Sequence, residues 1–446
     1  LSITKPVTLL LGATTLTISA KITLAANGIK IIGMGDATNI VYNTPASDSF
    51  PKLYATGRTG LIIRDIDLSG GEGPTASVPW TNADASVNGQ HGALLHNCTD
   101  FEISGVTANN LGYAGIHLIR SSRGRIAGNT ANSNTYAGIS VWGTDSGGSA
   151  NLYISGNVAN SNGALGASGF QGRGIVFSRV GTTNGVTSSQ IIGNQCNSNT
   201  YWGIEVYQFS HYNRIIGNTS NSNAFGGIHL WNNTGNIASF NEVRLNGSTS
   251  VPNEIGGVIN GGYGFRVGAT TSSTIHGNTV VGNNTQDVAN FNGITVDEEG
   301  TIASTGVQVT GNFVQNHGVN ASDINVDSAV DSALVHDNIL IGTTTTTPLS
   351  LTNTLSIRNI TAASDITSSI HRGDNSVRFV GPASGIVGFR TTGGTDAFYL
   401  TDSTGKLTQA VQMDATAAYT TTAQITSTLA IGTAPLVITS TTPVSI

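Results

Sequence analysis

The sequence predicts an all-β solenoid, a coil of short strands that repeats along most of the chain. A Gly-Ile-x-apolar phrase (once Gly-Phe) alternates with an apolar-x-Gly-Asn phrase, and such self-similarity at a period of a few tens of residues is the signature of a repeat architecture. Charged residues make up only 10% and glycine accounts for 57 residues, which suits short strands joined by tight turns. The Gly-Ile phrases begin at residues 115, 138, 174, 203, 227, 264 and 293.

The N-terminal part of the chain is predicted to form the first coils. Residues 1–60 alternate apolar and polar side chains and are broken by Gly and Asn every few residues. Residues 60–110 continue this pattern but contain the polar insertion GGEGPTASVPWTNADASVNGQ at 70–90. Loops of that length on a regular scaffold often carry function.

The central repeats predict a basic coil of about 23 residues. Successive Gly-Ile phrases are 23, 36, 29, 24, 37 and 29 residues apart, so the longer spacings imply inserted loops at 145–150 or 164–173 and at 247–262. The Gly-Asn dipeptide marks a coil corner. Asn there can adopt the left-handed conformation and can hydrogen-bond to its equivalents along a stack.

The pattern changes near the C-terminus, which predicts a second module. Residues 1–342 are assigned to the solenoid and residues 343–446 to a Thr-rich, β-rich module that serves oligomerisation. The stretch TTTTTPLSLTNTLS at 343–356 has the composition of a boundary. The chain ends inside the strand-like run PLVITSTTPVSI, which indicates that more chain followed.

Strand alternation converts the repeat into a predicted surface. If the Gly of each Gly-Ile phrase is position 0, positions +1 and +3 are almost always apolar and point inward, so positions +2 and +4 point outward. Parallel strands in successive coils lie about 4.8 Å apart, so equivalent positions form columns. The +2 column is His117, Ser140, Val176, Glu205, His229, Arg266 and Thr295, and the +4 column is Ile119, Trp142, Ser178, Tyr207, Trp231, Gly268 and Asp297.

These columns predict a polysaccharide-binding face. Aromatic rings stack on sugar rings, and ionisable groups bind hydroxyls or carboxylates. The alternative is that inserted loops or a neighbouring subunit cover the rings. A further set, two or three residues before each Gly-Ile, is expected to form an aromatic ladder at a coil corner: Tyr113, Tyr136, Tyr201 and Phe225. The residues assigned to substrate binding are Trp142, Tyr207, Trp231, His117, Arg266 and Arg173.

Two reactions fit such a face. Hydrolysis needs two carboxyl groups, and Glu205 is the only carboxylate in the +2 column, with Asp145 (roughly 10 Å away by strand spacing) or Glu254 as its partner in an inverting pair. An alternative role for Glu205 is to bind a sugar hydroxyl or to pair with His229 or Arg266. Elimination needs a base near the C5 proton of a uronate and a cation for its carboxylate. For elimination the columns offer His117, His229, Tyr207 and Arg266.

Other partners and cofactors are not indicated. The net charge is −6 and no basic run occurs, so nucleic acid is not expected as a partner. No apolar run reaches the roughly 18 residues of a membrane span. No zinc or nucleotide motif is present, and no cofactor is expected. The acidic run at 297–299 could hold Ca²⁺ but is more typical of a solvated turn. Cys98 and Cys196 are expected to be buried thiols.

The phrase NSNTYAGISVWG…LYISGN, repeated as NSNTYWGIEVYQ…RIIGNTSNSNAFGGIHLW, resembles the repeat of right-handed parallel β-helix proteins of the NosD, mannuronan epimerase and pectate-lyase-like types. The resemblance covers about residues 20–340. The opening TLTISAKITLAANGIKIIGMGDATNIVYN and the Thr-rich end are similar to phage tailspike and tail-fibre segments. The epimerase phrase Tyr-Gly-x-Asp-Pro-His is absent, because Arg266 and Val267 follow Tyr263-Gly264-Phe265.

This resemblance implies a right-handed parallel β-helix with a C-terminal β-rich module. A tailspike-like protein would be a homotrimer, located outside the cell or on a virion, that binds and cleaves a bacterial exopolysaccharide or capsule. The prediction is therefore a polysaccharide depolymerase, acting as a glycoside hydrolase. A polysaccharide lyase and a non-catalytic glycan-binding adhesin are the alternatives.

Overall fold

The computed structural model describes most of the chain. It divides into one compact unit at Leu1–Gly373 and a second at Asp374–Ile446. The described residues are 1–43, 50–70, 89–163, 172–247, 250–252, 258–260, 262–283, 292–298, 302–315, 322–327, 330–341, 349–351, 355–358, 361–362, 367–368, 386–390 and 397–401.

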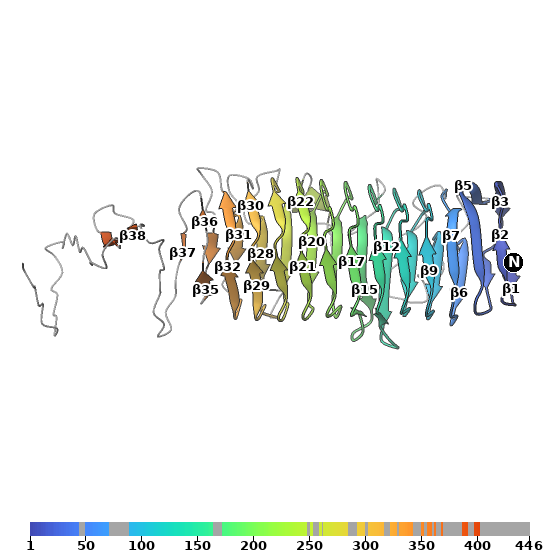
Figure 1. Ribbon diagram of the computed structural model, residues 1–446, viewed down its shortest axis with the longest axis horizontal. Helices are drawn as coiled ribbons and strands as arrows, with labels where there is room; N and C mark the ends of the chain where they lie inside the picture. The colour runs from blue at the N-terminus through green and yellow to red at the C-terminus, as the bar shows by residue number, and fades with distance from the viewer. Residues whose placement is uncertain are drawn as a thin grey trace, which may run out of the picture. The chain divides into compact units, whose positions relative to one another are not determined.

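The first unit is a parallel β-helix, as predicted. Every regular element among the described residues is a strand, and successive coils stack so that each strand pairs with its equivalent one coil away (Figure 1). Two long parallel sheets and one shorter sheet run along the stack. Buried Ile, Val and Leu side chains from these sheets form one continuous core inside the coils.

The first long sheet, sheet A, holds the Gly-Ile phrases. Its strands, in order, are β1 (Ser2–Ile3), β4 (Ile22–Leu24), β6 (Leu53–Thr56), β8 (Ala93–His96), β10 (Ala114–Ile119), β12 (Ala137–Thr144), β15 (Arg173–Val180), β18 (Trp202–Val206), β20 (Gly226–Trp231), β25 (Tyr263–Gly268), β28 (Ile294–Asp297), β31 (Ile324–Val326), β34 (Leu349–Leu351) and β37 (Thr367–Ser368).

The second long sheet, sheet B, holds the strand part of the Gly-Asn phrases. Its strands are β2 (Thr8–Leu10), β5 (Lys30–Tyr42), β7 (Ile62–Asp67), β9 (Glu102–Ser104), β11 (Arg125–Ala127), β14 (Tyr153–Ser155), β17 (Gln190–Ile192), β19 (Arg214–Ile216), β21 (Ile237–Ser239), β26 (Thr274–His276), β29 (Val307–Thr310), β32 (Ala333–His336) and β35 (Leu355–Arg358), with β3 (Thr14–Ile18) beside β5.

The remaining strands are short. The third sheet contains β22 (Glu242–Arg244), β27 (Thr279–Val281), β30 (Phe313–Gln315), β33 (Ile339–Ile341) and β36 (Thr361–Ala362). Three strand pairs complete the described elements: β13 (Ser149–Ala150) with β16 (Val186–Thr187), β23 (Ser250–Pro252) with β24 (Val258–Asn260), and β38 (Ile386–Arg390) with β39 (Ala397–Thr401).

Two details refine the expected organisation. The predicted insertion at 247–262 contains the antiparallel pair β23–β24. Parallel pairing continues past residue 342, through β34, β35 and β36 to β37, all of which lie in the first unit. In the second unit the described strands β38 and β39 pair antiparallel, in agreement with its predicted β-rich character.

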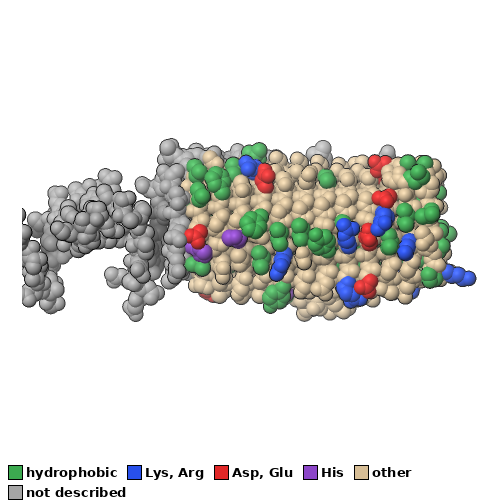
Figure 2. Space-filling view, viewed as in Figure 1, with side chains coloured by type: hydrophobic (Ala, Val, Ile, Leu, Met, Phe, Trp, Pro, Cys, Tyr) green, Lys and Arg blue, Asp and Glu red, His purple; other side chains and the backbone are tan. Residues whose placement is uncertain are grey.

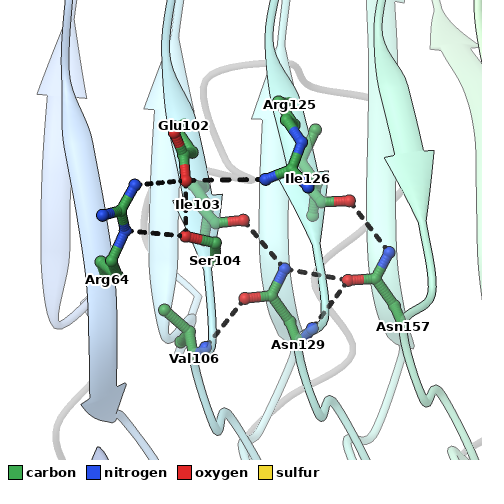
Figure 3. Close-up of polar contacts among 9 residues, drawn as sticks. All are labelled: Arg64, Glu102, Ile103, Ser104, Val106, Arg125, Ile126, Asn129 and Asn157. Atoms are coloured by element: carbon green, nitrogen blue, oxygen red, sulfur yellow. Dashed lines mark hydrogen bonds and ion pairs between the residues drawn. The ribbon is translucent and has the colours of Figure 1, made fainter. Parts of the chain in front are cut away.

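In the Gly-Asn corner the glycine adopts the left-handed conformation, and the asparagine makes the hydrogen bonds along the stack. The glycines adopt the left-handed conformation, with φ of 62° at Gly128 and 60° at Gly156, whereas the assignment of that conformation to Asn was wrong. The asparagines that follow are buried and form a ladder along the stack, as predicted (Figure 3), and Phe240 and Asp337 take the place of the glycine before Asn241 and Asn338. The ladder consists of Asn129, Asn157, Asn194, Asn218, Asn241, Asn278, Asn312 and Asn338.

Each ladder amide is fully used, so its loss is expected to be costly. The Asn218 Nδ2 donates to the Ile191 carbonyl (2.9 Å) and to Asn241 Oδ1 (3.0 Å), while its Oδ1 accepts from Asn194 Nδ2 (2.9 Å). Asn218→Ala would leave buried donors and acceptors unpaired and should lower the free energy of unfolding by about 3 kcal/mol or more. Asn221→Ala, at a half-buried position, should cost about 1 kcal/mol. Equal losses in denaturant unfolding would contradict the buried ladder as a source of stability.

Charged side chains are sparse on the face shown in Figure 2, where most surface atoms belong to small polar residues and backbone. One charged cluster lies on sheet B, where Arg64 and Arg125 flank Glu102 at 2.8 and 3.6 Å (Figure 3). Both arginine side chains are more than 40% exposed, so these are surface ion pairs. Cys98 and Cys196 are free, buried thiols, as expected.

Candidate functional site

The predicted columns on sheet A are confirmed. The strand register aligns His117 with Ser140, Ser140 with Val176, and Val176 with Glu205. It then aligns Glu205 with His229, His229 with Arg266, and Arg266 with Thr295. The +4 column is aligned in the same way where its residues pair. These columns lie on the outer face of sheet A, which we define as the surface of this sheet that points away from the coil interior.

A third outward column was missed. The glycines at position 0 face the core: a Cβ added to Gly138 would lie 2.6 Å from the Ala131 carbonyl oxygen. Strict alternation therefore breaks at the Gly-Ile pair, and position −1 faces outward together with +2 and +4. Its clearest members are Arg173 and Trp202, and the Trp202 ring stacks on the +2 residue His229. The recurrence of Gly at position 0 of every phrase was the signal available in the sequence.

The predicted aromatic ladder is present. The rings of Tyr113 and Tyr136 stack at 4.7 Å with an interplanar angle of 17°, and those of Tyr201 and Phe225 lie 4.8 Å apart. The ladder rings also contact the outer face of sheet A. Tyr136 meets the edge of Trp142 at 5.9 Å. The ladder residues thus pack beside the outward columns instead of standing apart at a corner.

The expected exposure was wrong for five of the predicted site residues. The exposed fractions of Trp142, Glu205 and His229 are 2% each, that of Arg173 is 3%, and that of His117 is 0%. The neighbouring described rings explain part of this burial. Tyr113 and His91 pack on His117, at 5.8 and 4.8 Å between ring centroids. This packing by neighbouring rings differs from the cover by inserted loops or a neighbouring subunit that the sequence offers as the alternative.

The centre of the face is a buried chain of three side chains from three adjacent strands, Arg173 on β15, Glu205 on β18 and His229 on β20. Arg173 Nε donates to Glu205 Oε2, and Glu205 Oε1 lies 3.2 Å from His229 Nδ1. The guanidinium of Arg173 lies over two ladder rings, 5.4 Å from the centroid of Tyr136 and 4.9 Å from that of Tyr201. The Trp202 ring stacks on the imidazole at 4.5 Å and 14°.

Burial and pairing fix the charges of this chain. Desolvation by itself raises the pKa of Glu205, but the guanidinium of Arg173 and the hydrogen bond with His229 outweigh it, so the pKa is below the ordinary value. Desolvation lowers the pKa of His229 to about 4, against the attraction of Glu205. The resting state is therefore a charged Arg173–Glu205 pair beside a neutral imidazole.

A partly exposed strip borders this buried chain. Its members are Tyr207, Trp231, Tyr263 and Arg266, all half-buried. The Arg266 guanidinium lies 4.9 Å from the ring centroid of Trp231 and 5.4 Å from that of Tyr263. Its Nε donates to Asp297 Oδ2 at 2.8 Å, which fixes the orientation of the guanidinium. Tyr207 and Trp231 lie 5.9 Å apart. We call these four residues the aromatic strip.

The structure brings together only part of the predicted site. Glu205, His229, Arg173, Tyr207, Trp231 and Arg266 lie on adjacent coils. His117 and Trp142 belong to a second cluster of rings toward the N-terminus.

Of the two proposed carboxylate partners of Glu205, only Asp145 lies among the described residues. Ser140 and Glu205 occupy aligned positions two coils apart. Asp145 lies five residues past Ser140, which displaces it by roughly 16 Å along the strand direction in addition to the two-coil spacing. That exceeds the roughly 6.5–9.5 Å of an inverting pair. Asp145 instead accepts a hydrogen bond from the Thr183 backbone N–H at 3.1 Å, and such backbone bonds lower its pKa. Glu254 lies outside the described residues.

The described residues contain no group of three or more His, Cys, Asp or Glu side chains that could hold a metal ion. Within the acidic run at 297–299, Asp297 pairs with Arg266 and Glu298 is exposed, while Glu299 lies outside the described residues. In the part of the chain that is described, no helix is long and apolar enough to cross a membrane.

The comparisons with known proteins agree with this fold. A model of the right-handed β-helix region matches residues 12–159 and 91–243, which together span more than half of the chain. The chain therefore belongs to the right-handed β-helix family. No curated protein matches it in sequence.

The solved structures that this chain is similar to are only distantly related to it in sequence. The A-module of the mannuronan C-5 epimerase AlgE4 from Azotobacter vinelandii is 16% identical, with a TM-score of 0.55 over 82% of this chain and 91% of the module. The periplasmic alginate epimerase AlgG is 14% identical, with a TM-score of 0.51 over 80% and 74% of the two chains. The enzymatically active domain of tailspike protein 2 of bacteriophage CBA120 is 15% identical, with a TM-score of 0.43 over 78% and 47%.

Proposed function

We propose that this protein is an enzyme that acts on a polysaccharide at the outer face of sheet A. The observation that carries the proposal is the aromatic strip of partly exposed rings beside the buried Arg173–Glu205–His229 chain. Rings of this kind stack on sugars, and the charged chain supplies groups able to move a proton. The same fold in two epimerases whose names specify mannuronan and alginate supports the polymer as substrate class.

We further propose a bacterial exopolysaccharide or capsular polysaccharide as the substrate, and a homotrimer outside the cell or on a virion as the working form. These proposals rest on the resemblance of the N- and C-terminal sequence to tailspike and tail-fibre segments. They require neither a resident metal nor another cofactor.

The geometry supports elimination better than hydrolysis. Glu205 orients His229, whose neutral ring has an unprotonated nitrogen, Nε2. This nitrogen is buried in the resting structure, so the proposal requires that substrate binding expose it to take the C5 proton of a uronate. The C5–H electron pair then forms the C4=C5 double bond while the C4–O bond breaks, and the departing oxygen takes a proton from water. Arg266 would stabilise the charge that develops on the uronate carboxylate. Of the two carboxylates proposed as partners of Glu205 in hydrolysis, Asp145 lies too far along the strand direction, and Glu254 lies outside the described residues.

Hydrolysis remains the second candidate, because Glu205 is an ionised carboxylate on the same face as the aromatic strip. Product analysis on a panel of capsular polysaccharides and exopolysaccharides separates the possibilities. Elimination gives new reducing ends together with ultraviolet absorbance from an unsaturated uronate. Hydrolysis gives reducing ends without that absorbance. Binding without new ends would identify a non-catalytic adhesin, and neither binding nor products from any acidic glycan would contradict the proposal.

The aromatic strip can be tested separately by binding. Trp231→Ala should weaken binding of the identified glycan by roughly 10- to 100-fold, because one stacking platform is lost. Tyr153→Ala is the matched control, since Tyr153 is 40% exposed but lies on sheet B. Calorimetric titration of both variants gives the comparison. Equal affinities for Trp231→Ala and the wild type would show that the aromatic strip is not part of the binding site.

A further inference from the structure

We propose that Arg173 is a positioning residue that, by holding Glu205 as a paired anion, keeps His229 neutral with its proton on Nδ1. The inference rests on the proposed function, because it explains how a buried imidazole remains available as a base. It also concerns a column that alternation of side chains did not reveal.

Arg173 stands at position −1 of β15, where the aligned residue of β12 is Ala137. Only 3% of it is exposed, and its guanidinium lies over the rings of Tyr136 and Tyr201. A planar guanidinium fits such a site and donates to a carboxylate in a fixed direction, whereas an ammonium is a point charge without that plane.

The hydrogen bond between Glu205 and His229 can have only one direction. An ionised carboxylate only accepts hydrogen bonds, so the 3.2 Å contact places the imidazole proton on Nδ1. Nε2 then carries the lone pair. Among the described residues Nε2 has no hydrogen-bond partner, although it is buried. Stacking by Trp202 and an edge contact from Trp231, at 5.0 Å, hold the plane of the ring.

Arg173 and a protonated His229 would compete for the single carboxylate of Glu205. Among the described residues, the charged or titratable groups that act on the His229–Glu205 pair are Arg173, Arg266, Tyr136 and Tyr201. With Arg173 present, the charge of Glu205 is already balanced and a proton on His229 would add an unbalanced buried charge. Without Arg173, the buried carboxylate would draw a proton onto His229 and form an imidazolium pair, which has no lone pair left to act as a base.

The test is the protonation state of His229, measured by NMR of ¹⁵N-histidine-labelled full-length protein and assigned with His229→Gln. The wild type should show a neutral Nδ1–H tautomer from about pH 5 to pH 8. In Arg173→Met the pKa of His229 should rise from about 4 to about 6.5 or higher, the ordinary range of histidine, and the acid limb of the activity should move with it. Arg173→Lys should give a smaller rise.

Two results would overturn the inference. One is an Nε2–H tautomer in the wild-type protein, a measurement that needs no variant and so remains available if Arg173→Met does not fold. The other is an unchanged pKa of His229 in a folded Arg173→Met protein. If no glycan yields a product, the proposed function fails while the tautomer and its dependence on Arg173 are still decided by the spectra.

Discussion

His229→Gln should lower turnover of the glycan by about 10³-fold, within the roughly 10²- to 10⁴-fold range of general base catalysis, while changing affinity little. Glutamine keeps a polar side chain beside Glu205 but cannot take a proton. His276→Gln is the matched control, because His276 lies on sheet B and contacts Thr310. Turnover of His229→Gln within about threefold of the wild type would exclude this imidazole as the base.

The assignment of His229 as the general base also predicts where kcat/KM of the wild type falls on the acid side of its pH profile. The pKa of His229 is about 4 in the fold and about 6.5 in an unfolded chain, so the folded imidazole keeps its lone pair at pH 5. The unfolded chain binds the extra proton between these values, so this group's contribution to stability falls as pH drops from about 6.5 to about 4. We expect kcat/KM to hold down to about pH 5, and an acid limb near pH 6.5 would contradict a desolvated imidazole.

Glu205→Gln should destabilise the fold by about 3–5 kcal/mol, because it leaves the buried guanidinium of Arg173 without its counterion. The double variant Arg173→Met/Glu205→Leu should recover much of that loss, since both desolvated charges are gone, but it should remain inactive. Urea unfolding of the single and double variants measures both effects.

Glu102→Gln is the control for an ion pair in the same fold. Its partners Arg64 and Arg125 are exposed by 41% and 53%, so its loss should cost about 1 kcal/mol or less. Similar losses for Glu205→Gln and Glu102→Gln would show that the central pair is not buried in solution.

The sequence was sufficient for the fold because the repeat marks each coil twice. The Gly-Ile phrase places sheet A, and the Gly-Asn phrase places the corner and the asparagine ladder. The alignment of Glu205 with His229 and Arg266 followed from the phrase spacing alone. The residues whose contacts lie within adjacent coils were therefore predictable.

The rest of the site depended on features that alternation cannot reveal. The inward glycines shift the face of position −1, so Trp202 was missed as the ring that stacks on His229. Glu205 and Trp142 are buried by residues outside their own strands. The +2 and +4 pattern predicts which side of the sheet a residue faces but not which residues cover it. Asp145 is only two coils from Glu205, which suggested that the two carboxylates are close. It lies beyond the end of β12, however, so the two residues are separated along the strand direction.

A structure of full-length His229→Gln with a bound acidic oligosaccharide tests the central claim most directly. We predict a sugar ring on Trp231, its carboxylate toward Arg266, and its C5 beside residue 229 on the outer face of sheet A. An oligosaccharide bound over sheet B or the third sheet, with sheet A unoccupied, would contradict the account.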